Sequence, residues 1–293
     1  MKVGVAGIGK MGGAIAVRLI EVGHEVTVWN RTPEKAKAVN GASVATSPAE
    51  LAQRSEAVIT ILTDAAAIDA VYKGRSGLLD GEVGGKLFID MSTVLAATEV
   101  ALAAAVRAKG ASFVECPVGG STGPARQGKL IGLMGAEPAD AARARPLLEQ
   151  LSRRLEHAGP VGSGAVLKFT INLPLMVYWQ ALGEALALAR ALAIDPDRLM
   201  ELLSDTSGAA NVLKVRAPGI AAMLKGGAGG PVTFDVNSAI KDMQAMLAEA
   251  KSRGVELPLV ERALACYEET KQHRSGGAEI SAVSVYWAGR DRR

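Results

Sequence analysis

Three glycines near the amino terminus have the spacing that binds a dinucleotide. A G-x-G-x-x-G pattern that follows an apolar strand and opens a helix, within a unit of about thirty residues, is a dinucleotide-binding fingerprint. Its glycines permit a tight turn, close approach of the backbone to pyrophosphate, and close helix packing. The alternative is an ordinary strand-to-helix turn, because the chain has 33 glycines. The predicted cofactor-binding segment is Gly7, Ile8, Gly9, Lys10, Met11 and Gly12.

The position that would read the cofactor ribose carries no acid. About twenty residues after the glycines, chains that bind NAD normally offer Asp or Glu to the ribose hydroxyls. This chain offers Asn30, Arg31 and Thr32 instead. Asn30 does not repel a 2′-phosphate, Arg31 can bind one through its charged planar fork, and Thr32 adds a hydroxyl. The segment therefore favours NADP(H) over NAD(H); if Arg31 is only a solvated surface residue, the site accepts both.

Such a site needs a parallel sheet to position it, and the first half of the chain predicts one. Short β-rich runs alternate with alanine-rich helical stretches. We expect strands at 2–6, 25–29, 57–62, 86–90, 112–114 and 130–134, and helices at 11–22, 33–39, 48–54, 66–72, 97–109 and 139–151. Alternation of this kind predicts an α/β, Rossmann-type, doubly wound domain.

The second half of the chain predicts helices only. Apolar-periodic segments are found at 165–193, 196–204, 212–222, 239–252 and 258–272. Pro174 removes a backbone bond from the first of these and is expected to kink it. We place the domain boundary near 162–164, which gives an NADP-binding domain at 1–163 and an all-α domain at 164–293 for substrate binding and dimerisation.

Composition excludes several other classes of protein. With 49% hydrophobic and 22% charged residues, the 293-residue chain is typical of a globular protein. Its net charge of +3 is too small to indicate nucleic-acid binding. Cys116 and Cys266 form no CxxC, and His24, His157 and His273 have no metal-ligand spacing, so we expect no metal. There is no secretory signal and no long apolar run, which favours a cytoplasmic protein without a membrane partner.

Five segments, in order along nearly the whole chain, resemble the β-hydroxyacid dehydrogenase family. This family includes 3-hydroxyisobutyrate, glyoxylate/succinic semialdehyde and tartronate semialdehyde enzymes, and it falls within the 6-phosphogluconate dehydrogenase superfamily. The resemblance implies an oxidoreductase that is a homodimer or homotetramer. The segments are 7–12, 90–93, 117–123, 162–164 with Lys168 and Asn172, and 241–242.

The resemblance assigns chemistry to two residues four apart on a predicted helix. Lys168 matches the family's catalytic lysine, which bonds the reacting oxygen and donates the proton in reduction. Asn172 matches the asparagine that positions the lysine and the substrate, and residues four apart share one helix face. A lysine suits this task only if burial or neighbouring charge lowers its pKa, which apolar neighbours such as Phe169 favour. The alternative is a surface lysine on a long helix.

Four further residues match family positions around the cofactor. Thr93, at the end of a predicted strand, matches a position beside the nicotinamide and the substrate. Leu62 and Thr63 match the loop that passes under the cofactor. Lys241 matches a lysine that reaches from the helical domain toward the cofactor and helps to close the cleft. The alternative for Lys241 is a solvated residue paired with nearby acids.

The predicted substrate loop departs from the family pattern. The family commonly has Pro-Val-Ser-Gly-Gly, in which the serine hydroxyl and the following amides hold the substrate carboxylate. Here Gly119 occupies the serine position, and hydroxyls follow at Ser121 and Thr122. Backbone N–H groups of Gly120 and Ser121 can still bind an anion. The expected substrate-binding residues are Thr93, Gly119, Gly120, Ser121, Thr122, Lys168 and Asn172.

Together these residues predict an NADP(H)-preferring oxidoreductase, with NAD(H) as a possible cofactor. It would transfer a hydride between the nicotinamide and a small anionic hydroxyacid or semialdehyde. One alternative is an imine reductase, which shares the architecture but usually has Asp or Tyr where this chain has Lys168. The other is a non-catalytic NADPH-binding module, which the joint presence of Lys168, Asn172 and Thr93 disfavours.

Overall fold

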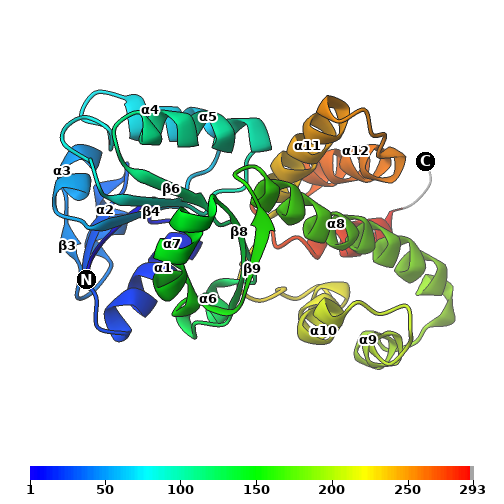
Figure 1. Cartoon of the computed structure of the whole chain (residues 1–293). Coiled ribbons are helices and arrows are strands. Elements are labelled where there is room, and N and C mark those ends of the chain that lie inside the picture. Colours follow the sequence, from blue (N-terminus) through cyan, green and yellow to red (C-terminus); the bar gives the residue numbers. More distant parts are fainter. Residues whose placement is uncertain (291–293) are drawn as a thin grey trace. The chain divides into compact units, whose positions relative to one another are not determined.

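The computed structural model describes residues 1–290, which form two compact units. The first unit is Met1–Phe169. The second begins at Thr170, inside the 27-residue helix α8 (Ser163–Ala189). Figure 1 shows the sheet of the first unit and the helices of the second.

The first unit contains one nine-stranded sheet. Six of its strands lie in the order β3-β2-β1-β4-β5-β6 and pair in parallel, which confirms the predicted doubly wound fold. β8 then pairs antiparallel with β6 and β7 and parallel with β9. The strands are β1 (Lys2–Ala6), β2 (Glu25–Trp29), β3 (Ser43–Val44), β4 (Ala57–Thr60), β5 (Leu87–Asp90), β6 (Ser112–Glu115), β7 (Val118–Gly119), β8 (Leu130–Gly135) and β9 (Ser152–Gly159).

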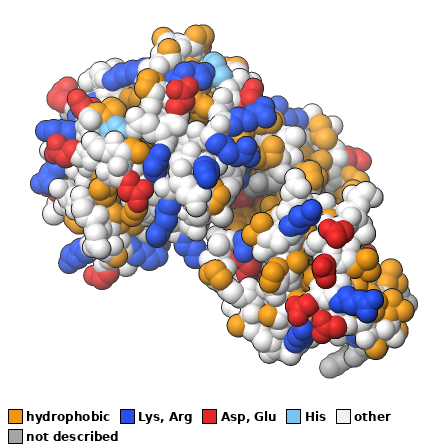
Figure 2. Space-filling model, turned by 90° about the horizontal axis from the view of Figure 1, so that it is seen from below, with side chains coloured by type: hydrophobic (Ala, Val, Ile, Leu, Met, Phe, Trp, Pro, Cys, Tyr) orange, Lys and Arg blue, Asp and Glu red, His pale blue; other side chains and the backbone are white. Residues whose placement is uncertain are grey.

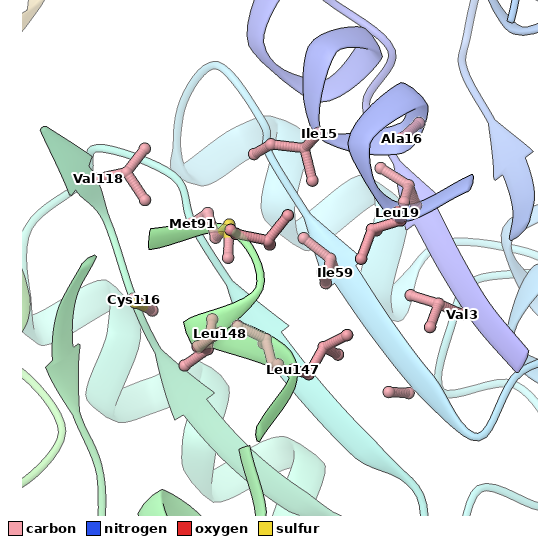
Figure 3. Packing of buried hydrophobic residues seen from close by; sticks show 14 of the residues in the cluster. Val3, Ile15, Ala16, Leu19, Ile59, Met91, Cys116, Val118, Leu147 and Leu148 are labelled. Carbon is pink, nitrogen blue, oxygen red and sulfur yellow. The ribbon is translucent and has the colours of Figure 1, made fainter. Parts of the chain in front are cut away.

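Helices cover both faces of this sheet, so the central strands are buried on both sides. On one face Ile59 of β4 packs with Ile15 and Leu19 of α1 (Figure 3). The preceding residue of β4, Val58, points to the other face of the sheet and packs in a second hydrophobic cluster with Leu102 of α5. The helices are α1 (Lys10–Glu21), α2 (Pro33–Lys37), α3 (Pro48–Gln53), α4 (Ala65–Lys73), α5 (Ala96–Arg107), α6 (Thr122–Arg126) and α7 (Pro138–Glu149).

Four elements of this unit were not expected from the sequence: β3, β7, α6 and β9. The first two have two residues each and α6 has five, too short for a periodic pattern. β9 has eight residues, but its sequence SRRLEHAG is polar, and none of its side chains is buried. β9 pairs with β8 alone, so its backbone ladder rather than side-chain burial makes it a strand.

The second unit is helical, as predicted, apart from one isolated bridge between Asp235 and Glu279 in the described residues. α8 continues through Pro174. The core includes the fully buried Trp179 and Tyr267, and the Tyr267 hydroxyl donates to the Met176 carbonyl at 2.9 Å. After α8 follow η1 (Arg190–Leu192), α9 (Pro196–Ser204), α10 (Asn211–Leu224), α11 (Val236–Ser252), α12 (Pro258–His273) and α13 (Ala282–Gly289), the last of which was not predicted.

The surface carries charges of both signs. On the face drawn in Figure 2, lysine and arginine side chains are interspersed with acidic and apolar ones. This mixture agrees with the small net charge of +3. Within residues 1–290, no helix combines the length and the apolar character needed to cross a membrane.

Candidate active site

Parallel pairing brings the carboxyl ends of five strands of the first unit into one row. The register pairs Ala6 of β1 with Trp29 on one side and Thr60 on the other. Thr60 pairs with Asp90, and Asp90 pairs with Glu115. The loops that follow these residues therefore start at one edge of the sheet. In doubly wound sheets ligands bind at this edge, where the strand order reverses, here between β1 and β4.

The glycine turn after β1 has the geometry that the fingerprint requires. Gly7 has φ +96°, and a Cβ there would overlap the carbonyl oxygen of Ile61. A Cβ on Gly12 would overlap the carbonyl oxygen of Gly7, so the third glycine packs against the turn itself. A Cβ on Gly9 would meet nothing within 4 Å. The backbone at Gly9 is therefore open to a ligand on the side where other residues carry a side chain.

Helix α1 begins directly at this turn without a side-chain cap. Its N-cap residue is Gly9, and no acidic residue lies in its first turn. The first N–H groups of a helix lack intrahelical partners, and the helix dipole favours an anion there. Lys10 adds an exposed basic side chain in the first helical position. This end of α1 fits a pyrophosphate, the group that the fingerprint predicts.

Asn30 has a role that the sequence did not indicate. Its side-chain oxygen accepts the Ile8 N–H at 2.9 Å, and its amide nitrogen donates to the Thr32 carbonyl at 3.0 Å. The amide therefore ties the glycine turn to the segment after β2. Arg31 and Thr32 are exposed at this end of the strand row.

A buried aspartate joins the loops that follow β4 and β5. Asp90 accepts the Thr60 hydroxyl at 2.5 Å and the Ser92 N–H at 2.8 Å. The Ser92 hydroxyl in turn accepts the Leu62 N–H at 2.9 Å. These bonds hold together two loops beside the glycine turn. The loops carry the predicted cofactor residues Leu62, Thr63 and Thr93.

Three fully buried carboxyl groups lie near this edge: Asp90, Glu99 and Glu115. Burial raises the pKa of Asp90, and it raises the pKa of Glu115 to about 7. Burial and then the charge of Asp90 raise the pKa of Glu99 well above its usual range. No donor group reaches either carboxyl oxygen of Glu99, and the Asp90 carboxyl lies beside it.

Lys168 lies against the predicted substrate loop. Its ammonium donates to the Val118 carbonyl at 2.8 Å, and its side chain is half-buried. Val118 and Gly119 form the short strand β7. Gly120 follows with φ +120°, a conformation that favours glycine, and Ser121 is the N-cap residue of α6. The loop residues Gly119, Gly120, Ser121 and Thr122 thus follow directly on the carbonyl that Lys168 contacts.

Glu115 is a residue that sequence reasoning missed. Its carboxylate accepts the N–H groups of Gly162 at 2.5 Å, Gly164 at 2.8 Å and Ala165 at 3.3 Å. These groups belong to the start of α8, the helix that carries Lys168. The only available signal was an acid at the carboxyl end of an apolar strand, directly before the predicted substrate loop.

In the second unit, Asn172 and Lys241 share a partner. The Asn172 amide reaches the Asp242 carboxylate at 3.5 Å, and the Lys241 ammonium pairs with it at 2.9 Å. Asp242 is buried, with 4% of its side chain exposed. Lys241 therefore makes the ion pair that its alternative reading expected, and Asp242 is a further residue that sequence reasoning did not single out for a role.

A metal centre and a cysteine nucleophile are two further kinds of reactive site. No three His, Cys, Asp or Glu side chains among residues 1–290 are arranged to hold a metal ion. Burial raises the pKa of the Cys116 thiol to about 12, so it is not a nucleophile at neutral pH.

Two family models together cover most of the chain. Residues 2–159 match the NAD-binding domain of 6-phosphogluconate dehydrogenase. Residues 162–287 match a model described as NAD-binding of NADP-dependent 3-hydroxyisobutyrate dehydrogenase. With the open glycine turn of α1, these matches identify the first unit as a binding domain for a nicotinamide dinucleotide.

Individual relatives agree with these models along their whole length. Glyoxylate/succinic semialdehyde reductase 1 of Arabidopsis thaliana is 34% identical over 285 residues, 97% of each chain. The 3-hydroxyisobutyrate dehydrogenase of Pseudomonas aeruginosa is 33% identical over 294 residues, 97% of this chain and 98% of the relative. The solved structure of Psf3 in complex with NADP+ and 2-OPP is 25% identical, with a TM-score of 0.84 over 97% of this chain and 99% of its own. The chain therefore belongs to the β-hydroxyacid dehydrogenase family.

Proposed function

We propose that the protein is an NADP(H)-preferring dehydrogenase that interconverts a small β-hydroxyacid and its semialdehyde, with Lys168 as the proton donor in reduction. The observation that carries this proposal is the 2.8 Å bond from the Lys168 ammonium to the Val118 carbonyl. It holds a proton-bearing group beside the loop that follows β6, in the same unit as the glycine turn. The named activities of the relatives support the class of substrate.

The roles of the residues follow from where they lie. The first turn of α1 would hold the pyrophosphate, and the loops joined by Asp90 and Ser92 would support the nicotinamide end. When bound, the nicotinamide supplies a hydride to a carbonyl carbon or accepts one from the alcohol. Lys168 would give a proton to the carbonyl oxygen in reduction and take it back in oxidation. Asn172, one helical turn further along α8, would orient the substrate from the same helix face.

NADP preference rests on the segment after β2. Asn30 is uncharged, and its side-chain oxygen accepts the Ile8 N–H, so this position carries no negative charge that would repel a 2′-phosphate. The Arg31 side chain is exposed and can form a charged, two-pronged bond with a phosphate. The structure of Psf3 with NADP+ is a precedent in a relative with the same fold.

The substrate is proposed to be a short acid with a carboxylate. Its anion would be bound by backbone N–H groups of Gly120 and Ser121 and by the hydroxyls of Ser121 and Thr122, because Gly119 provides no hydroxyl. This difference predicts a substrate preference distinct from that of family members with serine at the position of Gly119.

We also propose a homodimer or homotetramer, formed through the helical unit. Helix α8 is apolar around much of its circumference, and Leu188 near its end is 84% exposed. Val215 of α10 is 77% exposed. If such side chains form one contiguous apolar surface, that surface favours association. Light scattering on the purified protein measures the oligomer directly, and a monomer at micromolar concentration would contradict this part of the proposal.

The decisive experiment is a substrate screen on the purified protein. Glyoxylate, succinic semialdehyde and other short semialdehydes are offered with NADPH and with NADH, and the matching hydroxyacids with NADP+ and NAD+. We expect turnover of at least one pair, with higher kcat/KM for the phosphorylated cofactor. Cofactor binding without turnover of any member would favour the non-catalytic module instead.

A further inference from the structure

We propose that Glu115 is a positioning residue for Lys168: its buried carboxylate fixes the first turn of α8 and thereby sets where the lysine ammonium lies beside Val118. The proposal rests on the proposed function, in which Lys168 is the proton donor. Glu115 acts through the helix and not on the substrate.

Glu115 caps the start of α8 from a distant strand. One carboxylate oxygen accepts the N–H groups of Gly162 and Gly164 at 2.5 and 2.8 Å, and the other accepts that of Ala165 at 3.3 Å. The first N–H groups of a helix have no partner within the helix, and a negative group there also complements the helix dipole. Glu115 lies 47 residues before Gly162 in the chain, so this cap ties the helix to strand β6.

Three glycines make room for this arrangement. A Cβ on Gly135 of β8 would overlap the Glu115 carboxylate, and a Cβ on Gly164 would overlap the Leu133 carbonyl. Gly162 has φ +101°, which other residues rarely adopt. The start of α8, the end of β6 and strand β8 are thus packed around the carboxylate without space for additional side chains.

A second bond joins the same two segments one helical turn further on. Glu115, the last residue of β6, and Val118, the first of β7, are three residues apart, and Ala165 and Lys168 are three residues apart on α8. The N–H of Ala165 donates to Glu115, and one helical turn further on the Lys168 ammonium donates to the Val118 carbonyl. Without the carboxylate, the lysine bond alone would set the distance between helix and loop. A displacement of about 1 Å at a reacting group can cost on the order of 100-fold in rate.

Glu115→Gln is a conservative variant, and Glu99→Gln at a neighbouring buried acid is its matched control. Asp90 on β5 and Glu99 on α5 are the acids whose charges couple to Glu115, and burial raises its pKa to about 7. A protonated carboxyl keeps one carbonyl oxygen as an acceptor, and glutamine keeps the same oxygen. Glu115→Gln should therefore retain the bonds to Gly162 and Gly164. Glu99→Gln changes a neighbouring buried carboxyl whose oxygens accept no hydrogen bond from a donor group.

The test compares five full-length proteins: wild type, Glu115→Leu, Glu115→Asp, Glu115→Gln and Glu99→Gln. Glu115→Asp keeps the buried charge but withdraws the acceptor by one methylene, and serves if the leucine variant does not fold. Steady-state kinetics use the short semialdehyde identified by the screen, and NADPH binding is titrated separately. Amide hydrogen exchange is followed in the peptide that spans 162–169. Lys168→Ala is measured in parallel.

We expect Glu115→Leu and Glu115→Asp to lower kcat by about 10- to 100-fold, with less than about threefold change in the dissociation constant of NADPH. Exchange should rise in 162–169. Glu115→Gln should stay within about threefold of wild-type kcat, and so should Glu99→Gln. Wild-type kcat in Glu115→Asp, or an equal loss in Glu99→Gln, would overturn the positioning role. Wild-type kcat in Lys168→Ala would instead refute the proton-donor role itself, so the two failures are distinct.

Discussion

The side-chain oxygen of Asn30 accepts the backbone N–H of Ile8 at 2.9 Å, so an amide at the end of β2 closes the glycine turn at the end of β1. Ile8 is buried, which makes the loss of this acceptor costly. The residue that replaces the usual ribose-binding acid therefore also supports the turn that would hold the pyrophosphate.

Two substitutions at Asn30 separate these roles. Asn30→Asp keeps an acceptor for the Ile8 N–H but adds a negative charge, so NADP+ binding should weaken by at least about tenfold while NAD+ binding is retained. Asn30→Ala leaves the N–H unsatisfied, so both cofactors should weaken by about 1–3 kcal/mol. Calorimetric titration of both variants with both cofactors measures this. Equal weakening of both cofactors in Asn30→Asp would contradict the assignment.

Arg31→Ala should weaken NADP+ binding and leave NAD+ binding nearly unchanged. Loss of a hydrogen bond between charged partners should weaken the binding free energy of NADP+ by about 1.5–3 kcal/mol. Lys35→Ala, which removes another exposed positive charge from the neighbouring helix α2, controls for general electrostatics. A parallel loss for NAD+ and NADP+ in Arg31→Ala would show that the guanidinium does not read the 2′-phosphate.

Lys168→Ala should lower kcat by about 10²–10⁴-fold, the range for loss of a general acid, with NADPH binding nearly intact. Lys168→Arg keeps the positive charge but is a poor proton donor, so it should be almost as impaired. Asn172→Ala should lose less, because water can replace part of a positioning bond. Single-turnover kinetics with each variant provide the test, and high activity in Lys168→Arg would argue for charge alone.

Gly119→Ser should raise kcat/KM for short carboxylate semialdehydes. The substitution returns a hydroxyl donor to the loop beside the carbonyl that Lys168 contacts. One net hydrogen bond contributes about 0.5–1.5 kcal/mol, which corresponds to a two- to tenfold rise in kcat/KM. Kinetics with glyoxylate and succinic semialdehyde measure it. If every carboxylate tested becomes a poorer substrate, the loop accommodates a bulkier or differently charged group than the family's usual anion.

Deprotonation of Glu115 should lower the free energy of unfolding as the pH rises from about 4.5 to about 7. Its folded pKa is about 7 against 4.5 for an unperturbed glutamate. The folded protein binds the Glu115 proton more tightly than the unfolded chain does. Proton binding therefore adds its full contribution to the free energy of unfolding below pH 4.5, and this contribution is lost as the pH rises through the folded pKa of about 7. The difference corresponds to about 2–3 kcal/mol between pH 5 and pH 8. Urea unfolding of wild type and Glu115→Gln at both pH values isolates this contribution; equal pH dependence of the two would contradict it.

Local sequence determined the class of fold and the first half of the site. Strands β1 and β2 lie within the predicted bounds because apolar runs bordered by glycines and helical stretches are typical of buried parallel strands. The glycine turn was predictable because its function depends on backbone conformations that only glycine adopts readily, as the φ of +96° at Gly7 confirms. The family motifs identified Lys168, and its role remains a proposal.

Tertiary structure decided which distant residues support that site. The Asn30 bond to Ile8 spans 22 residues, the Glu115 bond to Gly164 spans 49, and the Asn172 contact with Asp242 spans 70. Periodicity reports only which side of a helix or strand is apolar, so it does not reveal such pairs. They depend on strand order and register, which align Ala6, Thr60, Asp90 and Glu115 at one edge of the sheet. A buried carboxylate at that edge needs partners, and only the folded chain brings the start of α8 to Glu115.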